Sequence, residues 1–372
     1  MVGSPLYMIL YGASAMLSLA ACFYLLLRRS NAIDPDVTSP VRLRRWTAAF
    51  FASMTLSHVW YMPTLYPTSA EDILLSYIIG GMLDFMTLIP LAISVLLSML
   101  QDRRRPLWPI FAMLAPCVAG LAVCAINRSD AILPMLYAYY LLFDIGLIIY
   151  VVRATRQYGR WLRDNYADLE HKEVWQSFVV LAIILLVFGI YVFEAHVPII
   201  KYITQVNGLI LVCYLLWRVE TLSDLSITVQ DTEESVDFKS PSPNLDDYEV
   251  SQTIHDKIGP LLQQHCIDTQ LYLQHDLTVS QLARAIGTNR FYLSQYFSRQ
   301  GITYNAYINS LRIDYFMDLY RKAVTARQSV TAQQLATKSG FHSYRTFSNA
   351  FKNQIGQTVA AWMKDEGQEK RV

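Results

Sequence analysis

Two polar stretches near the carboxyl end have the side-chain chemistry needed to read DNA. Arginine, glutamine and asparagine can form paired hydrogen bonds with base edges, while serine, threonine and lysine suit phosphate oxygens. One stretch offers Arg290, Ser294, Gln295, Ser298 and Arg299, and the other offers Arg345, Thr346, Ser348, Asn349 and Lys352. A solvated polar helix surface would account for one such stretch, but the presence of two favours binding to double-stranded DNA.

Both stretches belong to a repeated unit, and the repeat predicts the elements that position them. Gln281-Leu282-Ala283 with Gly287 recurs as Gln334-Leu335-Ala336 with Gly340, and LSQYF at 293–297 recurs as FSNAF at 347–351. In each copy a helix precedes a glycine turn, and Asn289 or Ser343 is suited to cap a second helix. Apolar residues at helical spacing after each cap would bury one face and turn the polar face outward. Each unit is therefore predicted to be a helix-turn-helix.

Residues 303–322, between the two units, carry apolar side chains at helical spacing. A helix of that length would span about 30 Å, close to the ~34 Å of one DNA turn, so it could hold the units over successive major grooves. Arg312 on this helix is expected to contact backbone phosphate. Residues 251–372 contain 14 Lys or Arg and 8 Asp or Glu, and this basic excess would attract a polyanion.

Residues 254–363 resemble the DNA-binding domain of the AraC/XylS family of bacterial transcription regulators. The resemblance rests on LARAIGTNRFYLSQYFSRQGITYNAYINSLRI and LATKSGFHSYRTFSNAFKNQIGQTVAAWM, above all on Gly340-Phe341, Phe347, Phe351 and Gly356. It implies two helix-turn-helix units joined by a long helix, binding to promoter DNA as a monomer or dimer, and activation through RNA polymerase. Carried over by position, it gives base contacts to Arg290, Ser294, Gln295, Arg345, Thr346 and Asn349, and phosphate contacts to Arg312 and Lys352. Val359 stands where the family commonly has proline, which is expected to loosen the start of the last helix.

The chain upstream has a different composition, because the apolar excess stops near residue 220. Hydrophobic residues make up 53% of the whole chain and charged residues only 16%. Segments long enough to cross about 30 Å of hydrocarbon occur at 5–27, 46–66, 73–100, 107–126, 131–152, 174–196 and 199–219. We therefore predict an all-α protein in which a seven-helix transmembrane bundle precedes the two helix-turn-helix units. The first segment lacks a basic start, so we expect it to be retained and not cleaved as a signal peptide.

Basic residues cluster in alternate loops of this predicted bundle. The loops after the first, third and fifth spans contain Arg28, Arg29, Arg42, Arg44, Arg45, Arg103, Arg104, Arg105, Arg153, Arg156, Arg160, Arg163 and Lys172. Such residues are retained on the cytoplasmic side of short loops. The prediction is a multi-pass protein of the inner, cytoplasmic membrane, with the amino terminus outside and everything after residue 220 in the cytoplasm.

Four ionisable residues lie in or near the predicted spans: His58, Asp84, Asp144 and Glu194. A carboxylate at mid-membrane costs at least about 2.5 kcal/mol on insertion scales, so it usually faces a cavity or a partner. Two interpretations stay open, namely a site for a signal or ion and hydrogen bonds that fix helix packing. The sequence contains no HExxH, GxSxG or Walker-type motif, and the five cysteines lack metal-binding spacing. We expect no catalytic residues, no metal site and no cofactor.

Residues 221–250 are acidic and contain Ser-Pro-Ser-Pro at 240–243, a composition that cannot bury enough apolar surface to fold alone. They are predicted to be a flexible linker between a sensor domain at 1–220 and a DNA-binding domain at 251–372. A homodimer switch fits such a linker, because it transmits proximity more easily than torque.

The leading hypothesis is a membrane-embedded one-component transcription regulator. Its spans would sense an unknown small-molecule or membrane signal among the lipids, and its cytoplasmic domain would bind promoter DNA. One alternative is an integral-membrane transporter or enzyme with a regulatory cytoplasmic helical module. Another is a regulator that the spans only anchor at the membrane.

Overall fold

The computed structural model describes residues 4–28, 31–33, 37–66, 69–129, 131–194, 198–225 and 257–369. Every named element among them is helical, which confirms the predicted all-α class. The described residues form two compact units, the first within 1–158 and 174–229 and the second within 159–173 and 230–372. The predicted linker at 221–250 lies, beyond residue 225, outside the described residues.

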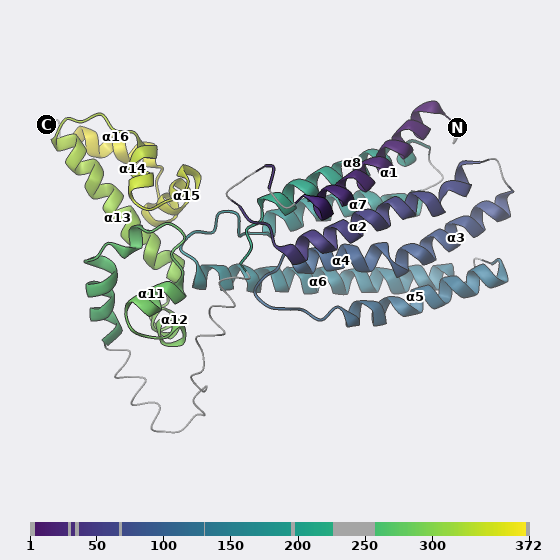
Figure 1. Cartoon of the computed structure of the whole chain (residues 1–372), viewed down its shortest axis with the longest axis horizontal. Coiled ribbons are helices and arrows are strands. Elements are labelled where there is room, and N and C mark those ends of the chain that lie inside the picture. The colour runs from purple at the N-terminus through teal and green to yellow at the C-terminus, as the bar shows by residue number, and fades with distance from the viewer. Residues whose placement is uncertain are drawn as a thin grey trace, which may run out of the picture. The chain divides into compact units, whose positions relative to one another are not determined.

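The first unit is a bundle whose long helices run alongside one another (Figure 1). Its elements are α1 (Pro5–Leu27), α2 (Val41–Trp60), η1 (Met62–Leu65), α3 (Ala70–Met86), α4 (Leu88–Ser98), α5 (Trp108–Asn127), α6 (Leu133–Asn165), α7 (Trp175–Glu194) and α8 (Pro198–Thr221). α1 packs against α2 and α8, α2 packs against α4, α3 packs against α5, and α7 packs against α8. The last turns of α6, from residue 159, belong to the second unit.

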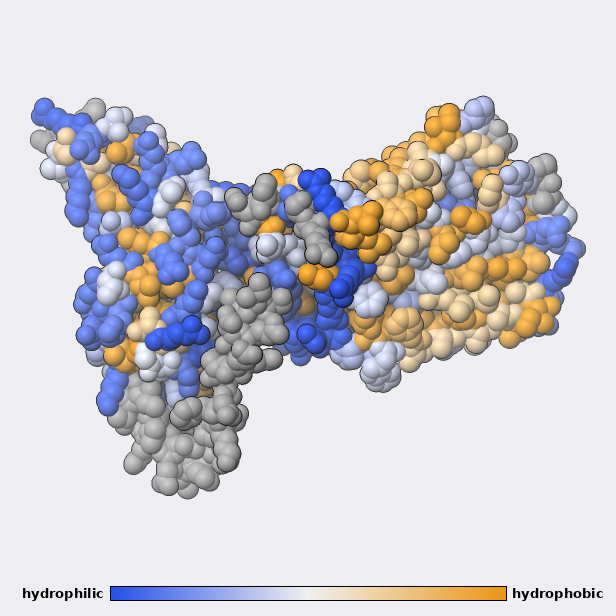
Figure 2. All heavy atoms as spheres, viewed as in Figure 1, coloured by the Kyte–Doolittle hydropathy of each residue, from blue (hydrophilic) through white to orange (hydrophobic). Residues whose placement is uncertain are grey.

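Apolar side chains cover most of the viewed surface of the first unit, whereas the second unit is largely hydrophilic (Figure 2). Leu27 is 77% exposed and Ile126 81% exposed, although both are strongly apolar. A soluble protein rarely leaves so much apolar surface exposed, and hydrocarbon chains would cover it. The helices of this unit therefore suit a lipid environment.

Among the described residues, five helical segments are long and apolar enough on their own to cross a membrane, and the predicted seven are not shown. They are Pro5–Leu27, Glu71–Ser98, Trp108–Asn127, Leu133–Asn165 and Ile199–Thr221. The basic residues in the first turns of α2 lower its hydropathy. In α7 the side chains are described only over the apolar stretch Trp175–Ile184, which is shorter than a membrane crossing. The predicted span 73–100 consists of α3 and α4, which meet at Thr87; Pro90 in the first turn of α4 lacks the N–H that a continuous helix would use.

The second unit contains the predicted repeat. Helical residues 257–262 lead into η2 (Gln263–Ile267, a π-helical turn) and η3 (Leu271–Leu273), followed by α11 (Val279–Ala285), α12 (Arg290–Arg299), α13 (Tyr304–Thr325), α14 (Ala332–Lys338), α15 (Tyr344–Ile355) and α16 (Val359–Glu369). The helix expected at 303–322 is α13. Thr278 and Thr331 form the same capping box at the starts of α11 and α14. The two copies therefore also share the way in which their first helix is capped.

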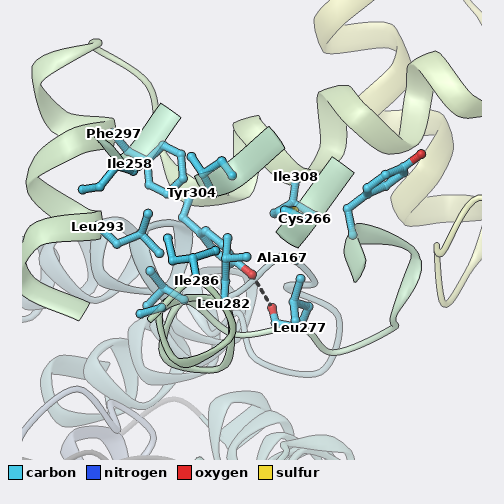
Figure 3. Packing of buried hydrophobic residues seen from close by; sticks show 14 residues of the cluster. Ala167, Ile258, Cys266, Leu277, Leu282, Ile286, Leu293, Phe297, Tyr304 and Ile308 are labelled. Atoms are coloured by element: carbon cyan, nitrogen blue, oxygen red, sulfur yellow. Dashed lines mark hydrogen bonds between the residues drawn. The ribbon is translucent and has the colours of Figure 1, made fainter. Parts of the chain in front are cut away.

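The two copies have separate hydrophobic cores, and α13 contributes to both. Ile308 of α13 lies in the first core with Leu282, Leu293 and Phe297, several of which are drawn in Figure 3. Ile313 and Phe316 of α13 lie in the second core with Leu335, Phe347 and Phe351. Val359, which replaces the family proline, is buried in this core at the first residue of α16. The last helix therefore begins at a residue whose side chain is packed in the core.

The η3 segment lies against the second helix-turn-helix. Gly340, in the α14–α15 turn, has φ +86°, and a Cβ there would stand 2.7 Å from the Leu273 carbonyl oxygen. Only glycine combines this positive φ with such close backbone approach. The repeated glycine of the second copy thus serves a contact between the two copies.

The structure gives Arg312 a structural role in place of the phosphate contact expected from the sequence. Its side chain is 1% exposed, Nε donates to the Tyr272 carbonyl at 2.7 Å, and Nη2 donates to the Gln274 carbonyl at 2.6 Å. The guanidinium also lies 5.6 Å from the ring centre of Phe341. On α13 this position faces the η3 segment, where the side chain does not reach solvent.

We predict that Arg312→Ala destabilises the second unit by about 2–4 kcal/mol, because two buried carbonyls lose their donor. Hydrogen exchange of the full chain in detergent would show this as faster exchange across 257–369. Lys352→Ala, at an exposed position, should change stability by less than about 0.5 kcal/mol. Unchanged exchange in Arg312→Ala, together with a smaller salt dependence of DNA binding, would contradict the structural role.

Candidate nucleic-acid interface

α12 and α15 are built in the same way, and each buries one face in its own core. Asn289 Oδ1 accepts from the Tyr292 amide at 2.9 Å, and Ser343 Oγ accepts from the Thr346 amide at 3.2 Å. These are the caps that the sequence predicted, and they satisfy amides that a helix start otherwise leaves unpaired. The buried faces carry Leu293 and Phe297 on α12, and Phe347 and Phe351 on α15.

Eight of the nine predicted DNA contacts lie on these two helices, away from the buried faces. Arg299, Arg345, Asn349 and Lys352 are exposed, and Arg290, Ser294, Gln295 and Thr346 are half-buried. The ninth, Arg312, is the buried residue of α13 described above. The structure therefore presents two polar helix faces of the kind that enter a major groove, each held by a helix-turn-helix.

Residues 159–173, which comprise the end of α6 and the connection to α7, lie within the same unit and interact with two of these candidates. Thr346 Oγ1 donates to Glu170 Oε2 at 3.2 Å, and Asp164 is close enough to Arg290 for electrostatic attraction. Burial lowers the pKa of Arg290, while nearby Tyr166 and Asp164 act in the opposite direction. Sequence analysis did not predict this packing, because DNYADLEHKE at 164–173 has the polar composition of an ordinary loop.

The ionisable residues predicted within the spans do not all lie together. His58 on α2 has Nδ1 2.7 Å from the Met54 carbonyl and Nε2 3.2 Å from Gln205 Oε1 on α8. Asp84 on α3 accepts from the indole N–H of Trp60 at 3.2 Å, so it lies near the same end of α2.

Aromatic rings extend the polar group around His58. The Tyr11 hydroxyl donates to the His58 carbonyl, and the two rings meet edge to face at 4.8 Å. Asp144 lies elsewhere, on α6, where Tyr140 hydrogen-bonds to it. The side chain of Glu194 lies outside the described residues. The structure thus brings His58 and Asp84 to one neighbourhood and leaves Asp144 apart.

Comparison with known proteins agrees with the geometry of the second unit. A family model described as a helix-turn-helix domain, of the AraC type, matches residues 282–365. Among curated proteins and solved structures, nothing matches this chain. The matched residues run from α11 to α16 and include both polar helix faces. The chain therefore carries an AraC-type DNA-binding helix-turn-helix domain, preceded in the described part of the chain by five helical segments long and apolar enough to span a membrane.

Proposed function

We propose that the protein is a membrane-embedded one-component transcription regulator, in which spans at 1–220 sense a signal and a domain at 251–372 binds promoter DNA. The observation that carries the proposal is the pair of capped helices, α12 and α15, with polar outward faces in a chain that also bears long lipid-compatible helices. RNA polymerase is the proposed downstream partner, by analogy with AraC-type domains. Residues 221–250 would form the flexible linker between these two domains.

The exposed side chains of α15 suit different parts of DNA. Arg345 and Asn349 can form paired hydrogen bonds with guanine and adenine edges, and Lys352 provides a mobile charge for a phosphate. On α12, Arg290, Ser294 and Gln295 would read bases, and Arg299 adds positive charge at the helix end. Bases and phosphates are thus contacted by different residues, and this separation can be measured.

We predict that Asn349→Ala costs about 1–3 kcal/mol of binding at a preferred site and relaxes the choice of one base pair. Lys352→Ala should weaken binding to all sequences alike and reduce the salt slope by about one. Crosslinked genome-wide occupancy of the full chain would identify sites, and titrations at several salt concentrations would compare the variants. Absence of discrete sites under every growth condition, with the protein present in the membrane, would favour the transporter or enzyme alternative.

Contacts at one end of the first unit support seven spans. Arg44 Nη1 lies 2.9 Å from Glu220 Oε1, and Gln101 hydrogen-bonds to the Ser223 carbonyl and the Leu225 amide, both at 2.9 Å. Residues that touch lie on the same side of a membrane, so an even number of crossings must separate them. Between Arg44 and Gln101 this requires α2 to cross together with α3–α4.

The same argument supports a crossing by α7. Gln101 and Ser223 are separated by α5, α6, α7 and α8. Because α5, α6 and α8 are each long and apolar enough to cross, the number of crossings is even only if α7 crosses as well. Residues 159–173 also pack with the unit that follows residue 225, so α7 and α8 must cross as a pair. Seven crossings then leave every basic loop on one side, which we propose to be the cytoplasm of a bacterial inner membrane.

We predict that alkaline phosphatase fused after residue 129 is active and that the same fusion after residue 105 is inactive. Phosphatase folds only outside the cytoplasm, so these fusions report which side each loop occupies. A green fluorescent protein fused after residue 372 should be fluorescent. With five spans, lacking α2 and α7, the activities of the two phosphatase fusions would be exchanged.

We further propose that the group around His58 and Asp84 is the signal site. Four helices meet there, because Tyr11, His58, Asp84 and Gln205 come from α1, α2, α3 and α8. A signal can shift the arrangement of helices only if it binds one arrangement better than another. Polar groups that already hydrogen-bond between helices can exchange those bonds for bonds to a ligand. Asp144 and Glu194 stay as further candidates.

We predict that Asp84→Asn and His58→Gln reduce the difference in DNA occupancy between growth conditions by at least about fivefold. DNA affinity of the purified protein should stay unchanged, because the substitutions leave α12 and α15 intact. Glu71→Gln, an exposed position on the same helix as Asp84, serves as the control. A normal response after the spans are replaced by an unrelated anchor would show that they only tether the regulator.

A further inference from the structure

Residues 159–173, which we call the strap, are built into the core of the first helix-turn-helix. Ala167 is 1% exposed and lies among the core residues drawn in Figure 3. Its amide donates to the Leu277 carbonyl at 3.1 Å, and Tyr166 pairs with Thr278 as an antiparallel bridge. Asn305 Nδ2 on α13 donates to the Ala167 carbonyl at 2.6 Å. The middle of the strap is therefore anchored by both backbone and packing.

An ion pair fixes the following part of the strap. Lys172 Nζ lies 3.0 Å from Asp276 Oδ1, just before α11. Partial burial by itself would raise the pKa of Asp276, but the Lys172 ammonium outweighs it and the pKa lies below its usual value. A lowered carboxylate pKa means that the pair stabilises docking at neutral pH and is lost as the pH falls through that pKa.

Between and beside these anchors, two carboxylates of the strap face the DNA-reading helices. Asp164 attracts Arg290, the first residue of α12, and Glu170 accepts from Thr346, in the first turn of α15. The amino-terminal residues of recognition helices are those that contact base edges. The strap thus engages one such residue in each helix-turn-helix.

These contacts compete with DNA. Thr346 Oγ1 cannot bond to a base while it donates to Glu170. The carboxylates of Glu170 and Asp164 would also repel an approaching phosphate. The competition is local, because the anchors at Ala167 and Lys172 keep Asp164 and Glu170 close to their targets at high effective concentration.

We propose that the strap is an autoinhibitory element: Glu170 holds Thr346, Asp164 adds negative charge beside it, and both carboxylates must move away before the domain binds its DNA site. This proposal rests on the proposed DNA-binding function. The strap begins within the last turns of α6, a single helix from Leu133 to Asn165 that carries Asp164. It therefore gives the spans a second covalent route to the DNA-binding unit besides residues 221–250. In this proposal, a signal that shifts α6 would move Asp164 and so change the DNA-binding unit.

The test compares DNA affinity of the full chain in lipid nanodiscs. The double variant Asp164→Asn/Glu170→Ala is first used to select duplexes that bind it from a library with a random centre. The affinity of one enriched duplex is then measured for the wild type and for each variant. The double variant should bind about tenfold more tightly than the wild type, because a charge-assisted hydrogen bond and an ionic attraction no longer compete. Hydrogen exchange at 257–369 verifies that each variant is folded.

The matched control is Asp314→Asn/Asp365→Ala, which removes two exposed carboxylates from α13 and α16 in the same unit. It reproduces the change in net charge and leaves the strap intact, so its gain in affinity should be less than about twofold. Equal affinities of the double variant and this control would overturn the strap proposal while leaving DNA binding in place. If neither the double variant nor the wild type enriches any duplex from the library, the proposed function is overturned, and the strap proposal with it.

Discussion

A buried guanidinium is costly unless its donors are satisfied, and Arg312 meets that requirement by binding the carbonyls of Tyr272 and Gln274. The segment it holds packs in the first core and lies against Gly340 in the turn of the second helix-turn-helix. Because the same side chain comes from α13, one interaction ties together the long helix, the η3 segment and both repeats. The positions of α12 and α15, and hence of their polar faces, depend on it.

The strap extends this constraint to the connection between α6 and α7. Backbone bonds at Ala167 and the amide of Asn305 give it a fixed place, so it is a structural part of the DNA-binding unit. Its Glu170 accepts a hydrogen bond from Thr346, so under the proposal above the same segment both supports the unit and competes with DNA. A regulator with this arrangement has two covalent connections from its spans, and only one of them is the acidic stretch after residue 220.

In the first unit, apolar and polar side chains make different kinds of contact. Exposed leucine and isoleucine side chains suit hydrocarbon, and several polar side chains hydrogen-bond between helices. Glu220, fully buried, binds Arg44, and Gln101 binds backbone groups after α8. These bonds hold loop residues and helix ends together at one end of the bundle. The group of His58, Asp84 and their aromatic neighbours holds four helices together elsewhere.

The sequence by itself determined the class of the protein, the repeated helix-turn-helix with its caps, and the polar faces of α12 and α15. Those features depend on local periodicity and on single capping residues, which a sequence displays directly. The tertiary structure alone decided that Arg312 is buried and that residues 159–173 pack against α11 and α13 and bind Thr346. Whether an arginine on a helix faces DNA or a carbonyl depends on which segment packs beside it. Whether a polar loop docks or stays in solvent depends on partners more than a hundred residues away. Neither outcome can therefore be predicted from local sequence.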